Sequence, residues 1–204
     1  LVIEEEKMQK ACEVAGKEPI FRILPYQKKK AGIVTTGSEV YYHRIEDKFT
    51  PVVIEKLKEC GVTEVKQIQC NDDHEMITEA IQTLIEDGSD LIVCTGGMSV
   101  DPDDRTPLAI KNACTEVVTY GAPVLPGAMF MLAYCEKEGR QIPVMGLPGC
   151  VMYAKRTIFD LVLPRIMCDE KLHEKDFRLL GQGGLCLSCP VCTFPNCGFG
   201  KGGY

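Results

Sequence analysis

One stretch of the sequence, Asp90–Thr106 (DLIVCTGGMSVDPDDRT), constrains the fold more than any other. A short apolar run, Leu91–Cys94, leads into Thr95–Gly97; an acidic loop follows, and Thr106 opens a new periodic segment. This order is typical of a buried strand, a glycine turn with backbone N–H groups free to contact a ligand, and a helix start. Open α/β sheets bind ligands beyond the carboxyl ends of their strands, so this turn is the first candidate site.

The remaining sequence alternates between apolar runs and segments of helical periodicity. We predict strands at residues 31–36, 64–69, 91–94, 116–120, 128–134 and 142–147, and helices at 4–15, 48–60, 73–87, 105–114 and 150–167. Asn71 or Asp72 is the expected N-cap of the third helix. The polar turn at 136–140 predicts a hairpin. Together these elements predict an α/β fold, a three-layer αβα arrangement with a mostly parallel sheet plus a hairpin.

Composition divides the chain into three parts. Residues 31–181 carry the strand–helix pattern, whereas residues 1–30 read as a linker helix and residues 182–204 as a small Cys-rich, metal-binding tail. The chain begins at Leu1 rather than Met, and we therefore expect further residues upstream. Its net charge of −6 argues against nucleic acid or an anionic membrane as partner, and it holds no apolar run of the roughly 20 residues that span a bilayer.

Three glycine turns follow predicted strands, at residues 35–39, 95–99 and 147–150. One such turn is weak evidence, because glycine after a strand is common. Three turns at the ends of parallel strands would meet at one edge of the sheet, where their N–H groups could bind a phosphate or another anionic ligand.

Two carboxylates, Asp47 and Asp104, each lie in a loop between one of these turns and a helix. Hard oxygen ligands beside a phosphate-binding turn suit Mg²⁺, so both are candidate catalytic and magnesium-binding residues. With about equal weight, each could instead cap the helix that follows it. Glu39 could accept hydrogen bonds from ring N–H groups of a ligand or be solvated, and Asp101 and Asp103 read as solvated loop charges.

The tail contains the strongest purely chemical signal. Of the twelve cysteines in the chain, eight are scattered singly, which fits reduced thiols and a cytoplasmic location. The other four form a C-x2-C-x2-C-x4-C pattern: Cys186, Cys189, Cys192 and Cys197. Four thiolates so close together need a cation, and either tetrahedral zinc or an iron–sulfur cluster fits, with zinc slightly preferred. The alternative is a set of free thiols without a metal.

The pattern TTGSEV, then Asp47, then DLIVCTGGMSV with Asp104 and Thr106-Pro107, then LPG twice, resembles the molybdopterin-binding domain of molybdenum cofactor biosynthesis proteins. The resemblance covers roughly residues 31–167. It implies that Asp47 and Asp104 hold Mg²⁺ and handle the ligand. It also implies a set of ligand-binding residues from the three turns: Thr36, Gly37, Ser38, Glu39, Gly96, Gly97, Met98, Ser99, Thr106, Pro148 and Gly149.

The same resemblance implies a function in maturation of the molybdenum cofactor. The protein would bind molybdopterin or its adenylylated form and promote Mg²⁺-dependent molybdate insertion, as a molybdopterin molybdenumtransferase does, or nucleotidyl transfer from ATP. A non-catalytic molybdopterin-binding carrier or sensor is the alternative. The tail is similar to that of a bacterial subgroup related to the molybdenumtransferase, and members of the family are commonly homo-oligomers.

Overall fold

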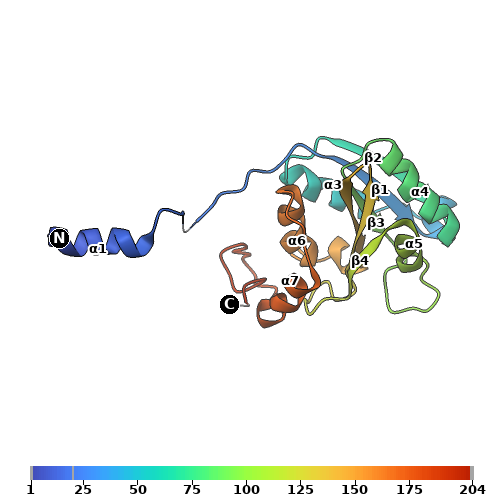
Figure 1. The fold of residues 1–204 in the computed structure, drawn as a ribbon. Coiled ribbons are helices and arrows are strands. Elements are labelled where there is room, and N and C mark those ends of the chain that lie inside the picture. The colour runs from blue at the N-terminus through green and yellow to red at the C-terminus, as the bar shows by residue number, and fades with distance from the viewer. Residues whose placement is uncertain (1, 20, 203–204) are drawn as a thin grey trace.

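A single six-stranded sheet forms the centre of the molecule (Figure 1). The computed structural model describes residues 2–19 and 21–202. The strand order is β2-β1-β3-β6-β5-β4, in which β2, β1, β3 and β6 pair in parallel, β5 pairs antiparallel with β6, and β4 pairs antiparallel with β5. The strands are β1 Lys30–Thr36, β2 Glu64–Cys70, β3 Leu91–Thr95, β4 Glu116–Tyr120, β5 Met131–Lys137 and β6 Arg140–Leu147.

Helices cover both faces of the sheet. The main helices are α3 Phe49–Glu59, α4 His74–Glu86, α5 Thr106–Ala113 and α6 Ile158–Met167. One hydrophobic core joins α3 and α6 to one face, and a second joins α4 and α5 to the other. Shorter elements are α1 Glu5–Ala15, α2 Ser38–Tyr41, the 3-10 turn η1 Gly149–Met152, α7 Glu174–Leu179 and the 3-10 turn η2 Leu180–Gly183. The predicted three-layer α/β fold with a hairpin is confirmed.

The position of β3 explains its uninterrupted apolar sequence. It lies between β1 and β6, and all five of its residues are buried. Leu91 and Val93 point into the core with α3 and α6, whereas Ile92 and Cys94 point into the core with α4 and α5. A strand buried on both faces cannot alternate apolar with polar residues, and its sequence shows no such alternation.

The predicted long helix over residues 150–167 is wrong. After β6 the chain forms the short turn η1, and α6 begins only at Ile158. Thr157 and Asp160 form a capping box, in which the Thr157 side chain accepts from the Phe159 N–H and Asp160 accepts from the Thr157 N–H at 2.8 Å. These side-chain bonds satisfy free backbone donors and therefore start a new helix there.

Two smaller expectations are also corrected. The N-cap of α4 is Asp73, which accepts from the backbone N–H groups of Glu75 and Met76, rather than Asn71 or Asp72. These hydrogen bonds hold the pKa of Asp73 below its usual value. The hairpin strand β5 starts at Met131 instead of residue 128, because a turn in which the Phe130 N–H donates to the Gly127 carbonyl comes first.

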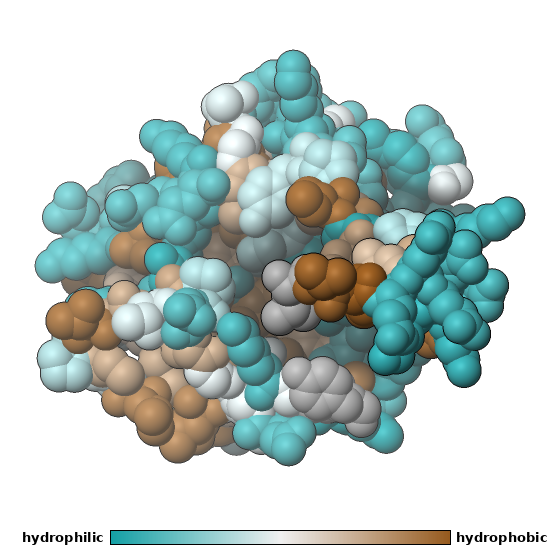
Figure 2. Space-filling model, turned by 90° about the vertical axis from the view of Figure 1, so that its left-hand side faces the viewer, coloured by the Kyte–Doolittle hydropathy of each residue, from teal (hydrophilic) through white to brown (hydrophobic). Residues whose placement is uncertain are grey.

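The N-terminal segment lies apart from the rest of the chain (Figure 1). Helix α1 buries none of its residues, and Phe21 and Ile23 in the following segment are 89% and 96% exposed. Seen from the side of α1, the surface shows separate hydrophobic patches among hydrophilic residues (Figure 2). Among the described residues, no helix has the length and apolar sequence needed to cross a membrane.

Candidate functional site

Strands β1, β3 and β6 end side by side. Thr35 pairs with Thr95 between β1 and β3, and Thr95 pairs with Leu147 between β3 and β6. All three strands are parallel, so the turns that follow them emerge at one edge of the sheet. The prediction that the three glycine turns meet at one edge is confirmed.

The central turn is held by two buried threonines. The Thr106 hydroxyl donates to the Gly96 carbonyl at 2.8 Å and lies 3.2 Å from the Thr36 hydroxyl. Gly96 has a φ of 87°, and a Cβ there would lie 2.3 Å from the Thr36 carbonyl oxygen. Only glycine fits this approach. Thr36 and Thr106 were expected to bind the ligand; in the structure their buried side chains hold the central turn in place.

An apolar groove of about 540 Å³ runs beside this turn. It brings together four of the expected ligand-binding residues from two turns: Met98, Ser99, Pro148 and Gly149. The 125–129 loop and the start of the tail complete its walls. Leu125, Cys150 and Leu185 were not predicted as site residues. The repeated LPG sequence at 125–127 and 147–149 was the one signal that marked the second loop.

The polar groups of the first turn, residues 35–39, contact Asp72 instead of the groove. The backbone N–H and the hydroxyl of Ser38 both donate to Asp72 Oδ2, at 2.8 and 2.9 Å. Glu39 is exposed on the short helix α2, which starts directly after Gly37. These residues lie at the predicted edge of the sheet, but the groove beside the central turn is not lined by them.

Asp104 is bound into the acidic loop after the central turn. Its Oδ2 accepts from the Ser99 backbone N–H, and its own N–H donates to the Asp101 carbonyl at 3.1 Å. Burial and the nearby Asp104 carboxylate raise the pKa of Tyr120, whose hydroxyl lies 3.4 Å from the Ser99 carbonyl. Asp104 thus fixes the position of Ser99, a residue of the groove.

Asp47 has a different role. Its Oδ1 accepts from the backbone N–H groups of Phe49 and Thr50, both at 3.0 Å, and its Oδ2 accepts from the Gln67 side chain at 3.1 Å. Asp47 therefore caps the first turn of α3, which was the alternative to a catalytic role given above. With Glu46 and Gln69 it lines a separate cavity, apart from the groove.

The tail is a folded loop attached to the domain. The Leu125 N–H donates to the Gly184 carbonyl at 2.6 Å, and the Cys186 N–H donates to the Leu125 carbonyl at 2.8 Å. At the other end of the loop, Phe199 is 5% exposed and belongs to the core that contains α6. Through Phe199 the tail is anchored in the core of the domain.

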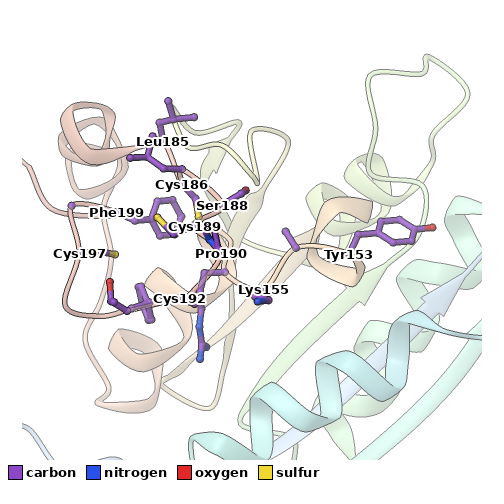
Figure 3. Close-up of a pocket in the computed structure, with 16 residues that line it drawn as sticks. Tyr153, Lys155, Leu185, Cys186, Ser188, Cys189, Pro190, Cys192, Cys197 and Phe199 are labelled. Atoms are coloured by element: carbon purple, nitrogen blue, oxygen red, sulfur yellow. The ribbon is translucent and has the colours of Figure 1, made fainter.

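The four tail cysteines line one cavity of about 410 Å³. Figure 3 shows Cys186, Cys189, Cys192 and Cys197 on the loop around it, with Phe199 between its arms and Tyr153 pointing away. Within residues 2–19 and 21–202, no three His, Cys, Asp or Glu side chains are already gathered as metal ligands. A metal would therefore require the loop to close around it, as metal sites commonly do on binding.

Differences in burial should make the thiols react at different rates. Cys12, Cys189 and Cys192 are exposed, whereas burial raises the pKa of the Cys70 thiol to about 11. Since the thiolate is the reactive form, brief alkylation of the metal-free chain at mildly alkaline pH should label the exposed cysteines before Cys70. Mass spectrometry of the peptides checks this order. Equal labelling of Cys70 and Cys12 in the native chain would contradict it, and unfolding in urea should remove the difference.

Residues 32–167, more than half of the chain, match the sequence profile of a family described as "Probable molybdopterin binding domain". The chain belongs to this family, as the motifs around the glycine turns predicted. It therefore contains a molybdopterin-binding domain of the kind associated with molybdenum cofactor biosynthesis.

Curated relatives match part of the chain. A CinA-like protein of Mycobacterium sp. (strain MCS) is 35% identical over 85 residues, which are 42% of this chain and 20% of that protein. A CinA-like protein of Mycobacterium avium (strain 104) is 34% identical over 95 residues, 47% of this chain and 22% of that protein. The matched region thus spans about a fifth of the length of these relatives.

Solved structures share the fold. The tungsten cofactor synthesizing protein MoaB from Pyrococcus furiosus aligns with a TM-score of 0.57 at 19% identity, covering 72% of this chain and 99% of that one. A putative molybdenum cofactor biosynthesis protein from Corynebacterium diphtheriae aligns with a TM-score of 0.56 at 14% identity, covering 70% and 97%. At such identities the likeness concerns the fold alone.

Proposed function

We propose that this chain binds molybdopterin, or its adenylylated form, in the groove beside the central glycine turn. The proposal includes promotion of molybdate insertion, in the manner of a molybdopterin molybdenumtransferase, or of nucleotidyl transfer from ATP. The observation that carries it is the meeting of Met98, Ser99, Pro148 and Gly149 from two strand-end turns along one groove. The apolar walls suit a flat ring system. The Ser99 hydroxyl, whose oxygen accepts from the Asp101 N–H, keeps its own hydrogen to donate to a phosphate oxygen.

The carboxylates fit Mg²⁺ unequally. Asp104 is the better ligand, because it stands in the loop that positions Ser99 and only its Oδ2 is engaged by that residue. Both oxygens of Asp47 are taken up by the cap of α3 and by Gln67. Magnesium prefers one or two carboxylates together with substrate phosphates, whose charge it would neutralise when bound. We therefore assign the metal-binding and catalytic role to Asp104 and a positioning role to Asp47.

A non-catalytic carrier or sensor is the second candidate. It is favoured by the hydrogen bonds that hold both carboxylates in local backbone contacts: Asp104 with Ser99, and Asp47 with Phe49 and Thr50. A carrier needs the groove but no carboxylate free for chemistry. The two candidates therefore share a ligand and differ in turnover.

Turnover of Asp104→Asn separates these candidates. We expect the wild-type chain to convert molybdopterin with Mg²⁺ and ATP, or adenylylated molybdopterin with Mg²⁺ and molybdate. Loss of the Asp104 charge should lower this rate by about a hundredfold or more, because one charged group that acts at the transition state is commonly worth a few kcal/mol. Chromatographic quantification of the product measures the rate.

The control for this substitution is Asp103→Asn, which removes a neighbouring, exposed carboxylate from the same loop. Its rate should stay close to that of wild type. Tight binding of molybdopterin by the wild-type chain without any turnover would support the carrier and overturn the enzyme.

We extend the proposal to the tail and to self-association. The four tail cysteines hold zinc or an iron–sulfur cluster, supported by their position around one cavity. Lys155 and Arg156 line the same cavity and would offset part of the thiolate charge. Homo-oligomerisation is proposed from the resemblance to the family, and light scattering of the purified chain measures it.

A further inference from the structure

The segment 184–186 forms part of two cavities. Leu185 and Cys186 line the groove that contains Met98 and Ser99, and both also line the cavity of the four cysteines. The hydrogen bonds between this segment and Leu125 fix its backbone in the wall between the cavities. A change in the cysteine loop that moves this segment must therefore reshape the groove.

The loop is firmly held at its base. The Gly200 N–H donates to the Gly183 carbonyl at 2.7 Å and closes the two ends of the loop on each other. A Cβ at Gly184 would lie 2.0 Å from the Pro123 carbonyl oxygen, which shows how closely the backbones pack there. Phe199 anchors the returning arm in the core. The ends of the loop are consequently part of the domain.

The tip of the loop is exposed by comparison. Leu187 and Val191 are each 77% exposed, and the tip cysteines Cys189 and Cys192 are exposed as well. Figure 3 places the tip cysteines and the base cysteines Cys186 and Cys197 around the same cavity. Coordination of one metal by all four would draw the tip towards the base and restrain Cys186, the residue next to Leu185.

We propose that metal binding by the tail cysteines and ligand binding in the groove are coupled through residues 184–186. Leu125 already holds the backbone of this wall, so a metal on Cys186 would restrain its side chains, among them Leu185, which is 60% exposed, before the ligand arrives. The ligand then pays less conformational entropy and binds more tightly. Because coupling is reciprocal, the ligand must tighten metal binding by the same factor. This inference rests on the proposed binding of molybdopterin in the groove.

Titration calorimetry with two forms of the chain tests the coupling. One form is loaded with Zn²⁺, and the other is stripped with a chelator under reducing, anaerobic conditions. We expect the loaded form to bind molybdopterin at least about fivefold more tightly, the lower end of typical coupling between sites. Competition with a chromophoric chelator should show the same factor in zinc affinity when molybdopterin is present. Equal molybdopterin affinities with zinc bound and removed would overturn the coupling.

Three variants assign the effect to the shared wall. Cys189→Ser removes a metal ligand that lines the cysteine cavity without lining the groove. Its affinity for molybdopterin should equal that of the zinc-free wild type, whether or not zinc is added. Leu185→Ala should still bind zinc but lose the affinity difference. Cys12→Ser, an exposed cysteine of α1, should behave as wild type. An unchanged difference in Leu185→Ala would contradict the route through the wall.

The same titrations separate failure of this inference from failure of the proposed function. A zinc-loaded chain that binds no molybdopterin overturns the proposed function. A chain that binds molybdopterin but takes up no zinc, with its four tail cysteines reduced, overturns the zinc site of the tail and the coupling, and leaves the proposed ligand site in the groove standing.

Discussion

Gly96→Ala is expected to destabilise the chain by on the order of 3 kcal/mol and to abolish ligand binding in the groove. The new Cβ would meet the Thr36 carbonyl oxygen at 2.3 Å and its hydroxyl at 2.6 Å, and backbone cannot move aside as a flexible side chain can. The φ of 87° adds strain for any residue with a Cβ. Urea denaturation measures the free energy of unfolding, and calorimetry with molybdopterin measures the binding.

Gly61→Ala is the matched control for this substitution. Gly61 has a φ of 85°, but a Cβ there would meet nothing within 4 Å. It therefore carries the backbone strain without the collision and should cost about 1–2 kcal/mol. Its ligand affinity should equal that of wild type. Equal losses of stability in the two variants would show that the close approach of Thr36 to Gly96 adds nothing to the cost of the substitution.

Asp160→Asn is expected to cost about 3–5 kcal/mol, because it breaks a buried ion pair by removing one partner. Asp160 Oδ1 accepts from Lys56 Nζ at 2.7 Å and from Arg156 at 2.8 Å, and the side chains of Asp160 and Lys56 are 4% and 11% exposed. Lys56 Nζ also lies 3.3 Å from the Lys155 carbonyl, so the pair ties α3 to the segment before α6. Without the charge of Asp160, the buried ammonium of Lys56 keeps the Lys155 carbonyl but has no carboxylate to offset its charge. Chemical denaturation gives the loss.

The control for Asp160 is a pair of the same charges at the surface. Asp87 contacts Lys66 at 3.0 Å, with side chains 50% and 60% exposed, and Asp87→Asn should change stability by no more than about 0.5 kcal/mol. A double variant, Asp160→Asn with Lys56→Met, should recover part of the loss, since it removes the unpaired buried charge and keeps a side-chain oxygen for the Thr157 N–H. If Asp160→Asn is as stable as wild type, the buried ion pair does not stabilise the fold.

The layer architecture was predictable because burial of one or both faces of an element produces a regular pattern of apolar residues in its sequence. Strand β3 reads as an unbroken apolar run since both of its faces are covered, and the period of α4 matches the stripe that it buries. Helix boundaries were less predictable where several neighbouring residues are equally good N-caps. Asn71, Asp72 and Asp73 are all good caps, and only Asp73 meets the free N–H groups of α4.

The candidate site was predictable to a similar degree. Turns after neighbouring parallel strands emerge at the same edge of the sheet, so the turns after β3 and β6 could be expected side by side, as the pairing of Thr95 with Leu147 shows. The sequence could not tell Asp47 from Asp104, because both stand between a turn and a helix. The structure separates them: Asp47 bonds to the start of α3, and Asp104 reaches back to Ser99.

By itself, the sequence determined the α/β class, the central glycine turn and the family, because these depend on local patterns of burial and backbone freedom. Only the tertiary structure decided which residues enclose the groove. Leu125 and Leu185 are far apart in the chain and have no motif in common, yet a backbone bridge places them in one wall. The same bridge brings the cysteine loop beside the groove. Contacts between distant segments arise from packing of the whole chain and leave no local pattern in the sequence.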